Sequence, residues 1–194
     1  LIKELHTNSK KIKVIHEGVT SSQITNYQLP ACAGRSNSQI KGTLDKFGLQ
    51  DKKYLLFVGT VQPRKNLTAL IEAYGDFVNG IPDQDPEKYG YKLVIAGSIG
   101  WMAQDILSAP SRLGIQEKVV FTGRVADLEL SNLYLGAQIY VQPSITEGFG
   151  LPVLEAMNAG VPVISSNGGA LPEVVGNAGL IVELGVMFRT ELAK

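Results

Sequence analysis

Several features that would point to common classes of protein are missing from this sequence. Its 194 residues include a single cysteine, Cys32, which can neither close an internal disulfide nor build a cysteine-based metal site. Only two histidines, His6 and His16, are present, so we expect no histidine-rich metal site. No apolar run approaches the ~20 residues that a membrane-spanning helix needs.

The sequence also lacks an excess of charge of either sign, since 18 Lys and Arg residues balance 18 Asp and Glu residues. This balance removes the bulk electrostatic argument for binding nucleic acid or an anionic membrane surface. The N-terminus begins Leu-Ile-Lys-Glu, with no Met and no signal-peptide pattern. We therefore expect a piece of a longer chain, holding one domain and a tail.

Short, continuous apolar runs alternate with segments of helical spacing over most of the chain. The apolar runs cover residues 54–58, 91–96, 119–121, 139–141, 161–164 and 179–182. The helical segments cover residues 66–78, 101–113 with a break near Pro110, 128–135 and 151–158. Runs without alternation are typical of strands buried on both faces, and helices between them imply parallel strands. The sequence predicts an α/β fold with a doubly wound parallel sheet and helices on both faces.

The segment before this region has a different composition. Residues 11–15 indicate a short strand, and residues 20–41 are rich in Ser, Asn, Gln and Gly with little apolar periodicity. Such a composition is typical of a linker or a mobile loop. Leu44, Phe47 and Leu49 indicate a short helix before the core. We divide the chain into a linker strand and loop (1–52), the α/β domain (53–183) and a tail (184–194).

Ligands of doubly wound sheets bind at the carboxyl ends of the strands, so the residues that follow each strand are the candidates. Gly59 and Thr60 follow the first strand, and Arg64 and Lys65 lie at the turn into the next helix. A helix N-terminus prefers anions, so two cations there indicate an anion bound between them and the free N–H groups. The alternative is a pair of solvated surface cations.

The loop after the fourth strand leads into a helix with Pro152 in its first turn. Gly148 and Gly150 allow the backbone to approach a ligand closely, and the loop can present N–H groups to phosphate or sugar oxygens. Glu147 and Glu155 can face the same site and accept hydrogen bonds from sugar hydroxyls. The alternative is a favourable pairing of both carboxylates with the helix dipole.

Other loops are open to two interpretations or are excluded. Arg124 and Val125 follow the third strand, where they form either a site for a base or an ordinary turn. Residues 165–173 again combine a Gly-rich loop with a Pro and an acidic residue. They form either a second ligand-binding loop or the ordinary start of a helix. Asp83 and Asp85 resemble a metal-binding pair, but they lie between prolines before a strand, at the opposite edge. We predict a solvated loop there.

Together these residues resemble a known family. The stretch from Glu147 to Glu155 resembles the E-x7-E motif of the retaining GT-B glycosyltransferases of family four, the glycosyl transferases group 1. Residues 14–19, 57–60, 63–66, 133–137, 141–144, 156–157, 160–163 and 171–174 are also similar to that family. The resemblance covers roughly residues 11–182 and implies two Rossmann-like domains that face each other across a cleft.

The resemblance implies that this chain is the C-terminal, donor-binding domain, preceded by an interdomain linker. Arg64 and Lys65 would hold the donor diphosphate, and Glu147 would bind the hydroxyls of the transferred sugar; these three are the predicted catalytic residues. The implied substrate-binding residues are Gly59, Thr60, Arg124, Val125, Gly148, Phe149, Gly150, Leu151 and Glu155. Among them, Arg124 and Val125 would flank the base and Glu155 would bind the ribose hydroxyls.

The implied activity is transfer of a sugar from a nucleotide-diphosphate sugar to a glycan or lipid-linked acceptor, with retention of the anomeric configuration. Cations and N–H groups would stabilise the departing diphosphate, so no metal or other cofactor is expected. The expected partners are the nucleotide-diphosphate sugar and a missing N-terminal acceptor domain, with no nucleic acid. Any membrane contact would come through the absent domain, and the expected location is the cytoplasm, peripheral at the inner face of the membrane for the full-length protein.

Some positions depart from the family pattern. Thr60 stands where many relatives have Arg, which makes Arg64 a candidate substitute. Residues 17–20 replace the usual Asn-Gly-Val-Asp after the linker strand, and His16 belongs to that linker, so neither is given a role. Two alternatives remain, a stand-alone nucleotide-sugar-binding regulatory module and a nucleotide-sugar epimerase. An in-frame domain upstream of Leu1 would favour the transferase, of which the fragment alone is expected to be inactive.

Overall fold

The computed structural model describes residues 36–80 and 90–184. Several predictions concern residues outside these ranges and are not addressed by the fold. They are the strand at 11–15, Cys32, His6, His16, the family-like segments at 14–20, the pair Asp83 and Asp85, and the tail beyond residue 184.

The described residues form one sheet of six parallel strands. The strands are β1 (Tyr54–Val58), β2 (Lys92–Ala96), β3 (Val119–Gly123), β4 (Ile139–Gln142), β5 (Val163–Ser166) and β6 (Leu180–Val182). Their order is β3-β2-β1-β4-β5-β6, so the direction of winding reverses between β1 and β4. The predicted doubly wound, Rossmann-like α/β fold is confirmed. Several strand boundaries differ from the apolar runs by one or two residues. The strand β5, for example, begins at Val163, after Pro162, which has no N–H to donate to a neighbouring strand.

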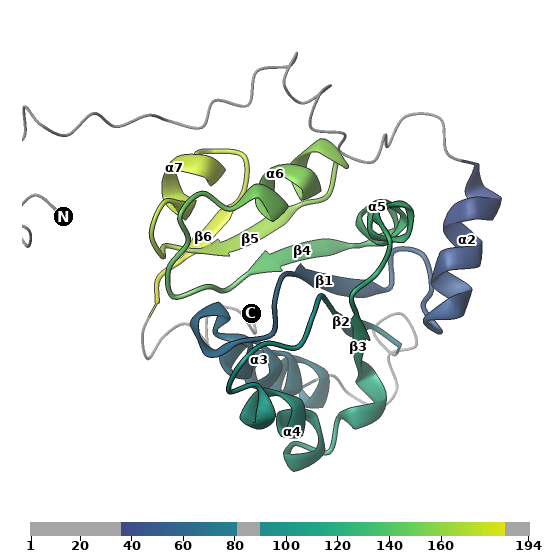
Figure 1. Cartoon of the computed structure of the whole chain (residues 1–194), viewed down its shortest axis with the longest axis horizontal. Coiled ribbons are helices and arrows are strands. Elements are labelled where there is room, and N and C mark those ends of the chain that lie inside the picture. Colours follow the sequence, from purple (N-terminus) through teal and green to yellow (C-terminus); the bar gives the residue numbers. More distant parts are fainter. Residues whose placement is uncertain (1–35, 81–89, 185–194) are drawn as a thin grey trace, which may run out of the picture.

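Helices cover both faces of this sheet, as the alternating pattern predicts. They are α2 (Asn37–Lys46), α3 (Leu67–Asn79), α4 (Gln104–Arg112), α5 (Asp127–Gly136), α6 (Leu151–Asn158) and α7 (Leu171–Val175). In Figure 1, α3 and α4 lie below the sheet, and α5, α6 and α7 lie above it. Among residues 36–80 and 90–184, no helix has the length and apolar character needed to cross a membrane.

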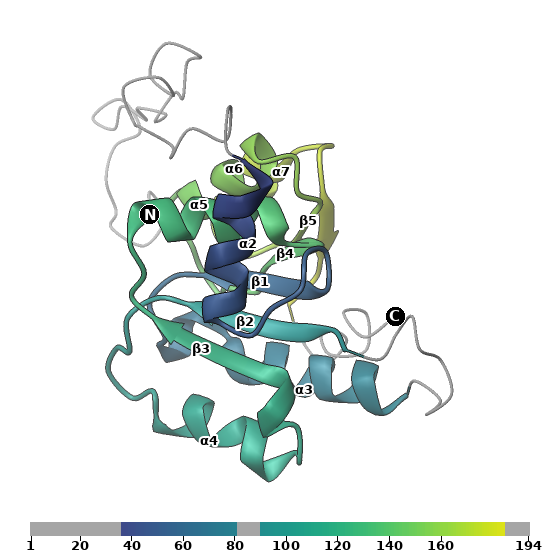
Figure 2. The same cartoon turned by 90° about the vertical axis from the view of Figure 1, so that its right-hand side faces the viewer.

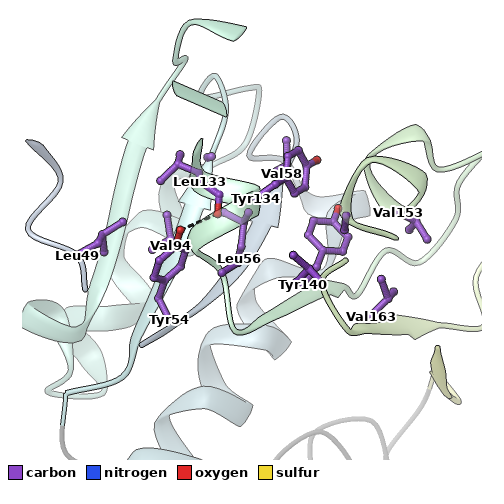
Figure 3. Close-up of a cluster of buried hydrophobic side chains, with 14 of the residues drawn as sticks. Leu49, Tyr54, Leu56, Val58, Val94, Leu133, Tyr134, Tyr140, Val153 and Val163 are labelled. Carbon is purple, nitrogen blue, oxygen red and sulfur yellow. Dashed lines mark hydrogen bonds between the residues drawn. The ribbon is translucent and has the colours of Figure 1, made fainter. Parts of the chain in front are cut away.

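The core consists of one apolar layer on each face of the sheet. Phe57 and Ile95 point toward α3 and α4, whereas Leu56 belongs to the layer beneath α5 and α6; all three are fully buried. This burial on both faces explains why the strands appear as continuous apolar runs. Figure 3 shows the second layer, in which the Tyr54 hydroxyl donates a hydrogen bond of 2.6 Å to the Leu133 carbonyl.

Helix α2 corrects the loop that composition predicts. The loop assignment is wrong over residues 37–41, which belong to α2. The helix begins in a capping box, in which the backbone N–H of Ser36 donates to the side chain of Gln39 at 3.3 Å. It packs along α5 (Figure 2), where Asn132 donates to the Thr43 hydroxyl at 2.8 Å. The segment that we assigned to the linker therefore contains a helix that packs on the core, and its polar composition led to the prediction of a loop.

The helix after β2 also differs from the prediction. It begins at Gln104 rather than at Trp101, and it is not broken near Pro110. Pro110 lies in the last turn of α4, so its missing N–H removes a hydrogen bond at the helix end without stopping the helix. Its carbonyl accepts a hydrogen bond of 2.9 Å from the N–H of Ile115.

Two glycines allow the loops after β1 and β2 to meet. Gly97 has φ +145, and a Cβ atom on it would collide with the carbonyl oxygen of Gly59. The N–H of Gly59 donates to the Ala96 carbonyl at 2.9 Å, and the N–H of Val61 donates to the Ser98 carbonyl at 2.9 Å. The backbone that leads toward Arg64 and Lys65 is thereby fixed to the neighbouring loop.

We predict that Gly97→Ala destabilises the fold by about 3 kcal/mol or more, because the added methyl group meets a backbone oxygen that cannot move aside. Gly114→Ala is the matched control, since Gly114 also has positive φ (+68) but nothing within 4 Å of an added Cβ. The control should cost about 1 kcal/mol, from backbone strain alone. Urea unfolding of both variants measures the difference, and equal losses would contradict the close approach of the two loops.

Candidate functional site

The turn after β1 separates the two predicted cations. A 3₁₀ turn, η2 (Pro63–Lys65), begins at a proline, and Asn66 then adopts a left-handed conformation with φ 56 and ψ 33. Asn tolerates this conformation better than most residues, and it redirects the chain into α3. As a result, the side chain of Lys65 is 9% exposed, whereas that of Arg64 is 50% exposed.

The loop after β4 is attached to this turn and to the loop after β5. The N–H of Ile145 donates to the Arg64 carbonyl at 2.9 Å, and the N–H of Ala170 donates to the Glu147 carbonyl at 3.0 Å. A Cβ atom on Gly168 would lie 2.5 Å from the Ile145 carbonyl oxygen, so a glycine is required for this approach. Three loops at the carboxyl edge of the sheet are thus packed into one unit.

Glu147 is the centre of this unit, and its side chain is 10% exposed. Its Oε1 atom forms an ion pair with Lys65 Nζ and accepts hydrogen bonds from Gln142 Nε2 at 3.0 Å and Ser144 Oγ at 2.9 Å. Its Oε2 atom lies 3.4 Å from Arg64 Nη1. The structure therefore brings Arg64, Lys65 and Glu147 together at the switch between β1 and β4.

The nearly buried ion pair between Lys65 and Glu147 is not an efficient way to stabilise a fold. Removing each charge from water costs several kcal/mol, and the attraction repays this only where the remaining hydrogen bonds are satisfied. The carboxylate meets that condition because it has four donors. The anion that the two cations at the helix start contact in this structure is therefore Glu147.

The second carboxylate, Glu155, has partners of its own. It lies on α6, and its Oε2 atom accepts a hydrogen bond of 2.8 Å from the hydroxyl of Tyr134 on α5. Burial raises the pKa of Glu155, the Tyr134 hydrogen bond acts in the opposite direction, and the charge of Asp127 adds to the increase. The rings of Tyr134 and Tyr140 lie with their centroids 5.8 Å apart in the buried layer (Figure 3), so α5 fixes the position of this carboxylate.

The glycine-rich loop forms the turn into α6. Gly150 is the N-cap with φ +92, which places its backbone in a region that favours glycine. Gly148 is exposed, whereas Phe149 and Leu151 are half-buried. The N-terminus of α6 therefore begins beside Glu147, as the sequence pattern predicts.

The remaining predicted residues lie along the same edge. Gly59 is beneath the side chain of Lys65, since a Cβ atom on it would lie 3.7 Å from Lys65 Cε. Thr60 and Arg124 are exposed, and Val125 is half-buried against the core beneath α5. Among the hydrogen bonds and ion pairs of the described residues, none joins Thr60, Arg124 or Val125 to the carboxylate of Glu147.

Sequence reasoning missed three side chains that hold the carboxylates in place, Gln142, Ser144 and Tyr134. One signal was available, because Gln142 is a polar residue at the end of an apolar strand that is buried on both faces. A buried amide needs hydrogen-bond partners, so its position predicts a polar network nearby. The identity of the partners depends on packing between elements and is not visible in the sequence.

A separate surface groove lies between α2 and the segment that precedes β1. Its lining includes Lys41, Leu44, Leu49, Lys52 and Leu135. These residues lie near the amino end of β1, so the groove is at the edge opposite Lys65 and Glu147.

The sequence of this chain is similar to those of known proteins. The family model for "Glycosyl transferases group 1" matches residues 43–187. O-antigen chain mannosyltransferase B of Escherichia coli is 41% identical over 127 residues, which are 65% of this chain and 32% of that protein. The chain therefore spans about a third of the length of this curated relative.

Two solved structures share the fold. Anabaena Alr3699/HepE, solved in complex with UDP and glucose, matches with a TM-score of 0.74 and 23% identity, over 98% of this chain and 48% of HepE. The C-terminal domain of a glycosyl transferase group 1 family protein (LpcC) from Francisella tularensis matches with a TM-score of 0.66 and 24% identity. That match covers 85% of this chain and 83% of the LpcC domain.

We predict that Glu155 makes stability depend on pH. Because folding raises the pKa of this carboxyl above its ordinary value of 4.5, its contribution to stability is fully present below that value. The contribution is lost as the pH rises through the higher folded pKa. The variant Glu155→Gln cannot ionise, so its free energy of unfolding relative to the unsubstituted chain should increase between about pH 4 and about pH 8.

Urea unfolding at several pH values measures this difference, and Glu173→Gln is the matched control because Glu173 is exposed on α7. The control shows what the loss of one exposed carboxyl does to the same measurement. A difference for Glu155→Gln that stays constant over this pH range would contradict the raised pKa.

Proposed function

Because this chain belongs to the glycosyl transferases group 1, we propose that it is the C-terminal, donor-binding domain of an enzyme that transfers a sugar from a nucleotide-diphosphate sugar. The observation that carries the proposal is the meeting of Lys65, Arg64 and Glu147 at the carboxyl edge, where doubly wound sheets bind ligands. The C-terminal position is supported by the match to the separately solved C-terminal domain of LpcC.

The diphosphate of the donor would bind Lys65 and Arg64. A phosphate oxygen is a strong acceptor, and an Arg guanidinium can bind it with two parallel N–H groups. The N-terminus of α6 lies beside these cations and adds backbone N–H groups with a favourable dipole. In this arrangement Lys65 exchanges its contact with Glu147 for a contact with the diphosphate, or bridges the two anions.

The two carboxylates would bind the hydroxyl groups of the donor. Glu147 lies beside the cations, so it is placed for the hydroxyls of the transferred sugar. Glu155 lies one to two turns into α6, toward α5, and would bind the ribose hydroxyls, with Tyr134 holding it in place. Arg124 and Val125, in the loop between β3 and α5, would then flank the base.

The chemistry follows from where charge develops. As the bond between the anomeric carbon and the diphosphate oxygen breaks, negative charge accumulates on the leaving group, and Lys65 and Arg64 are placed to stabilise it. We propose that the acceptor oxygen bonds to the same face of the anomeric carbon, with retention, and that its proton passes to the departing diphosphate. Because the cations meet this charge, the proposed reaction requires no metal ion.

Mannose is the sugar that the relatives favour, since the Escherichia coli protein is named a mannosyltransferase. The proposed acceptor is a glycan or a lipid-linked glycan. This acceptor would bind to an N-terminal domain of the full-length protein, which we place in the cytoplasm. The described residues do not include such a domain. The chain is therefore expected to bind the donor without transferring its sugar.

We predict that the chain binds a nucleotide-diphosphate sugar, as measured by calorimetry with a panel of UDP-, GDP- and ADP-sugars that includes GDP-mannose. Lys65→Ala should weaken binding of the matching nucleoside diphosphate by about tenfold or more, because a charge-assisted contact is lost. Binding of the nucleoside alone should change little, since Lys65 is assigned to the phosphates. EDTA should leave all of these affinities unchanged.

Lys41→Ala is the control for this series, because Lys41 is exposed on α2, away from the carboxyl edge. Thermal unfolding of both variants shows that they are folded. Equal losses for nucleoside and nucleoside diphosphate would contradict the phosphate assignment, and no binding by the unsubstituted chain at millimolar concentration would contradict the proposed function.

Retention of configuration requires the full-length protein and an acceptor. We predict that NMR of the product shows the same anomeric configuration at the transferred sugar as in the donor. Inversion would contradict the proposed same-face reaction. Donor binding without transfer to any glycan acceptor would favour a nucleotide-sugar-binding regulatory module instead.

A further inference from the structure

Gln142 is a fully buried amide whose hydrogen bonds connect the buried core to the candidate site. It is the last residue of β4 and has no exposed surface. Its Oε1 atom accepts a hydrogen bond from the hydroxyl of Tyr140, which is also buried. Its Nε2 group donates to Ser144 Oγ at 2.7 Å and to Glu147 Oε1 at 3.0 Å.

These contacts allow only one orientation of the amide. Ser144 Oγ donates its own proton to Glu147 Oε1 at 2.9 Å, so it must accept from its other neighbour, Gln142. If the amide turned over, its oxygen would face the acceptor oxygens of Ser144 and Glu147, and its NH₂ group would face the Tyr140 hydroxyl. The carboxylate of Glu147, which can only accept, therefore fixes the amide with its donor end toward Oε1, and the Tyr140 hydroxyl satisfies the amide oxygen at the other end.

The consequence for Glu147 is that its two oxygens are not equivalent. Oε1 is occupied by Lys65, Gln142 and Ser144 on the protein side. Among the described residues, Oε2 has only the longer contact of 3.4 Å with Arg64, whose side chain is half exposed. Oε2 is therefore the oxygen that an incoming hydroxyl group can reach.

We propose that Gln142 is a positioning residue that, supported at its amide oxygen by Tyr140, holds Glu147 with Oε2 directed at a hydroxyl of the transferred sugar. This inference rests on the proposed function, in which Glu147 binds that sugar. An apolar side chain would fill the same buried position at the end of β4 without any polar group to satisfy. The amide therefore contributes its hydrogen bonds, which act on the sugar-binding carboxylate and not on the cations that meet the diphosphate.

The quantity that tests the proposal is the sugar increment, defined as the Kd of the nucleoside diphosphate divided by the Kd of the matching nucleotide sugar. Calorimetry on the whole chain gives both constants. For Gln142→Leu, we expect the sugar increment to fall by about tenfold, or to disappear if it is smaller, because a hydrogen bond to a charged group is lost. The Kd of the nucleoside diphosphate should stay within about twofold, since Lys65 and Arg64 remain.

Tyr140→Phe tests this support without touching Glu147. Removing the hydroxyl leaves the buried amide oxygen of Gln142 without its donor, so the amide is held less firmly and the sugar increment should fall in the same direction. If the two residues act in series, the double variant should lose no more of the increment than Gln142→Leu alone. Gln138→Leu is the matched control, because Gln138 is exposed just before the other end of β4, and its increment should be unchanged.

Three results would overturn the inference. One is an unchanged sugar increment in Gln142→Leu with both affinities unchanged; the second is an unchanged increment with equal losses of both ligands, which would indicate a structural role; the third is additive losses in the double variant. An unsubstituted chain that binds both ligands equally would also overturn this inference, although the proposed binding of the diphosphate would still be supported. An unsubstituted chain that binds neither ligand would overturn the proposed function, and this inference with it.

Discussion

The contact between Lys65 and Glu147 is the constraint on which the carboxyl edge of this domain depends. It joins the loop after β1 to the loop after β4, at the point where the winding of the sheet reverses. A nearly buried charge pair is costly unless every remaining hydrogen bond is satisfied. Gln142 and Ser144 satisfy the carboxylate, and Asn66, in its left-handed conformation, sets the turn that directs Lys65 inward.

This arrangement gives the site both signs of charge within one small region. In the proposed function, the cations meet a diphosphate and the carboxylate meets hydroxyl groups. The close approach of Gly97 to Gly59 and of Gly168 to Ile145 keeps the loops in register. Such prearranged groups are worth most where charge develops during a reaction, because the protein does not have to reorganise at that moment.

The periodicity of the sequence predicts the sheet because strands buried on both faces must be continuously apolar, as residues 54–58 are. The topology of such sheets places Lys65 and Glu147 at one edge, so their proximity could also be anticipated. The first half of α2 was missed because its polar residues outnumber the few that face the core, and the short helix expected from Leu44 to Leu49 instead ends at Lys46. The role of Gln142 was missed because it depends on the Tyr140 hydroxyl and on the loop beyond, which meet only after folding.

The most direct test of this account is a crystal structure of the chain with a bound nucleotide-diphosphate sugar. The account predicts that the diphosphate contacts Lys65 and Arg64 beside the N-terminus of α6. It also predicts that a sugar hydroxyl donates to Glu147 Oε2 while Gln142 keeps its contact with Oε1. A nucleotide sugar bound away from these residues, or one whose sugar does not contact Glu147, would contradict it.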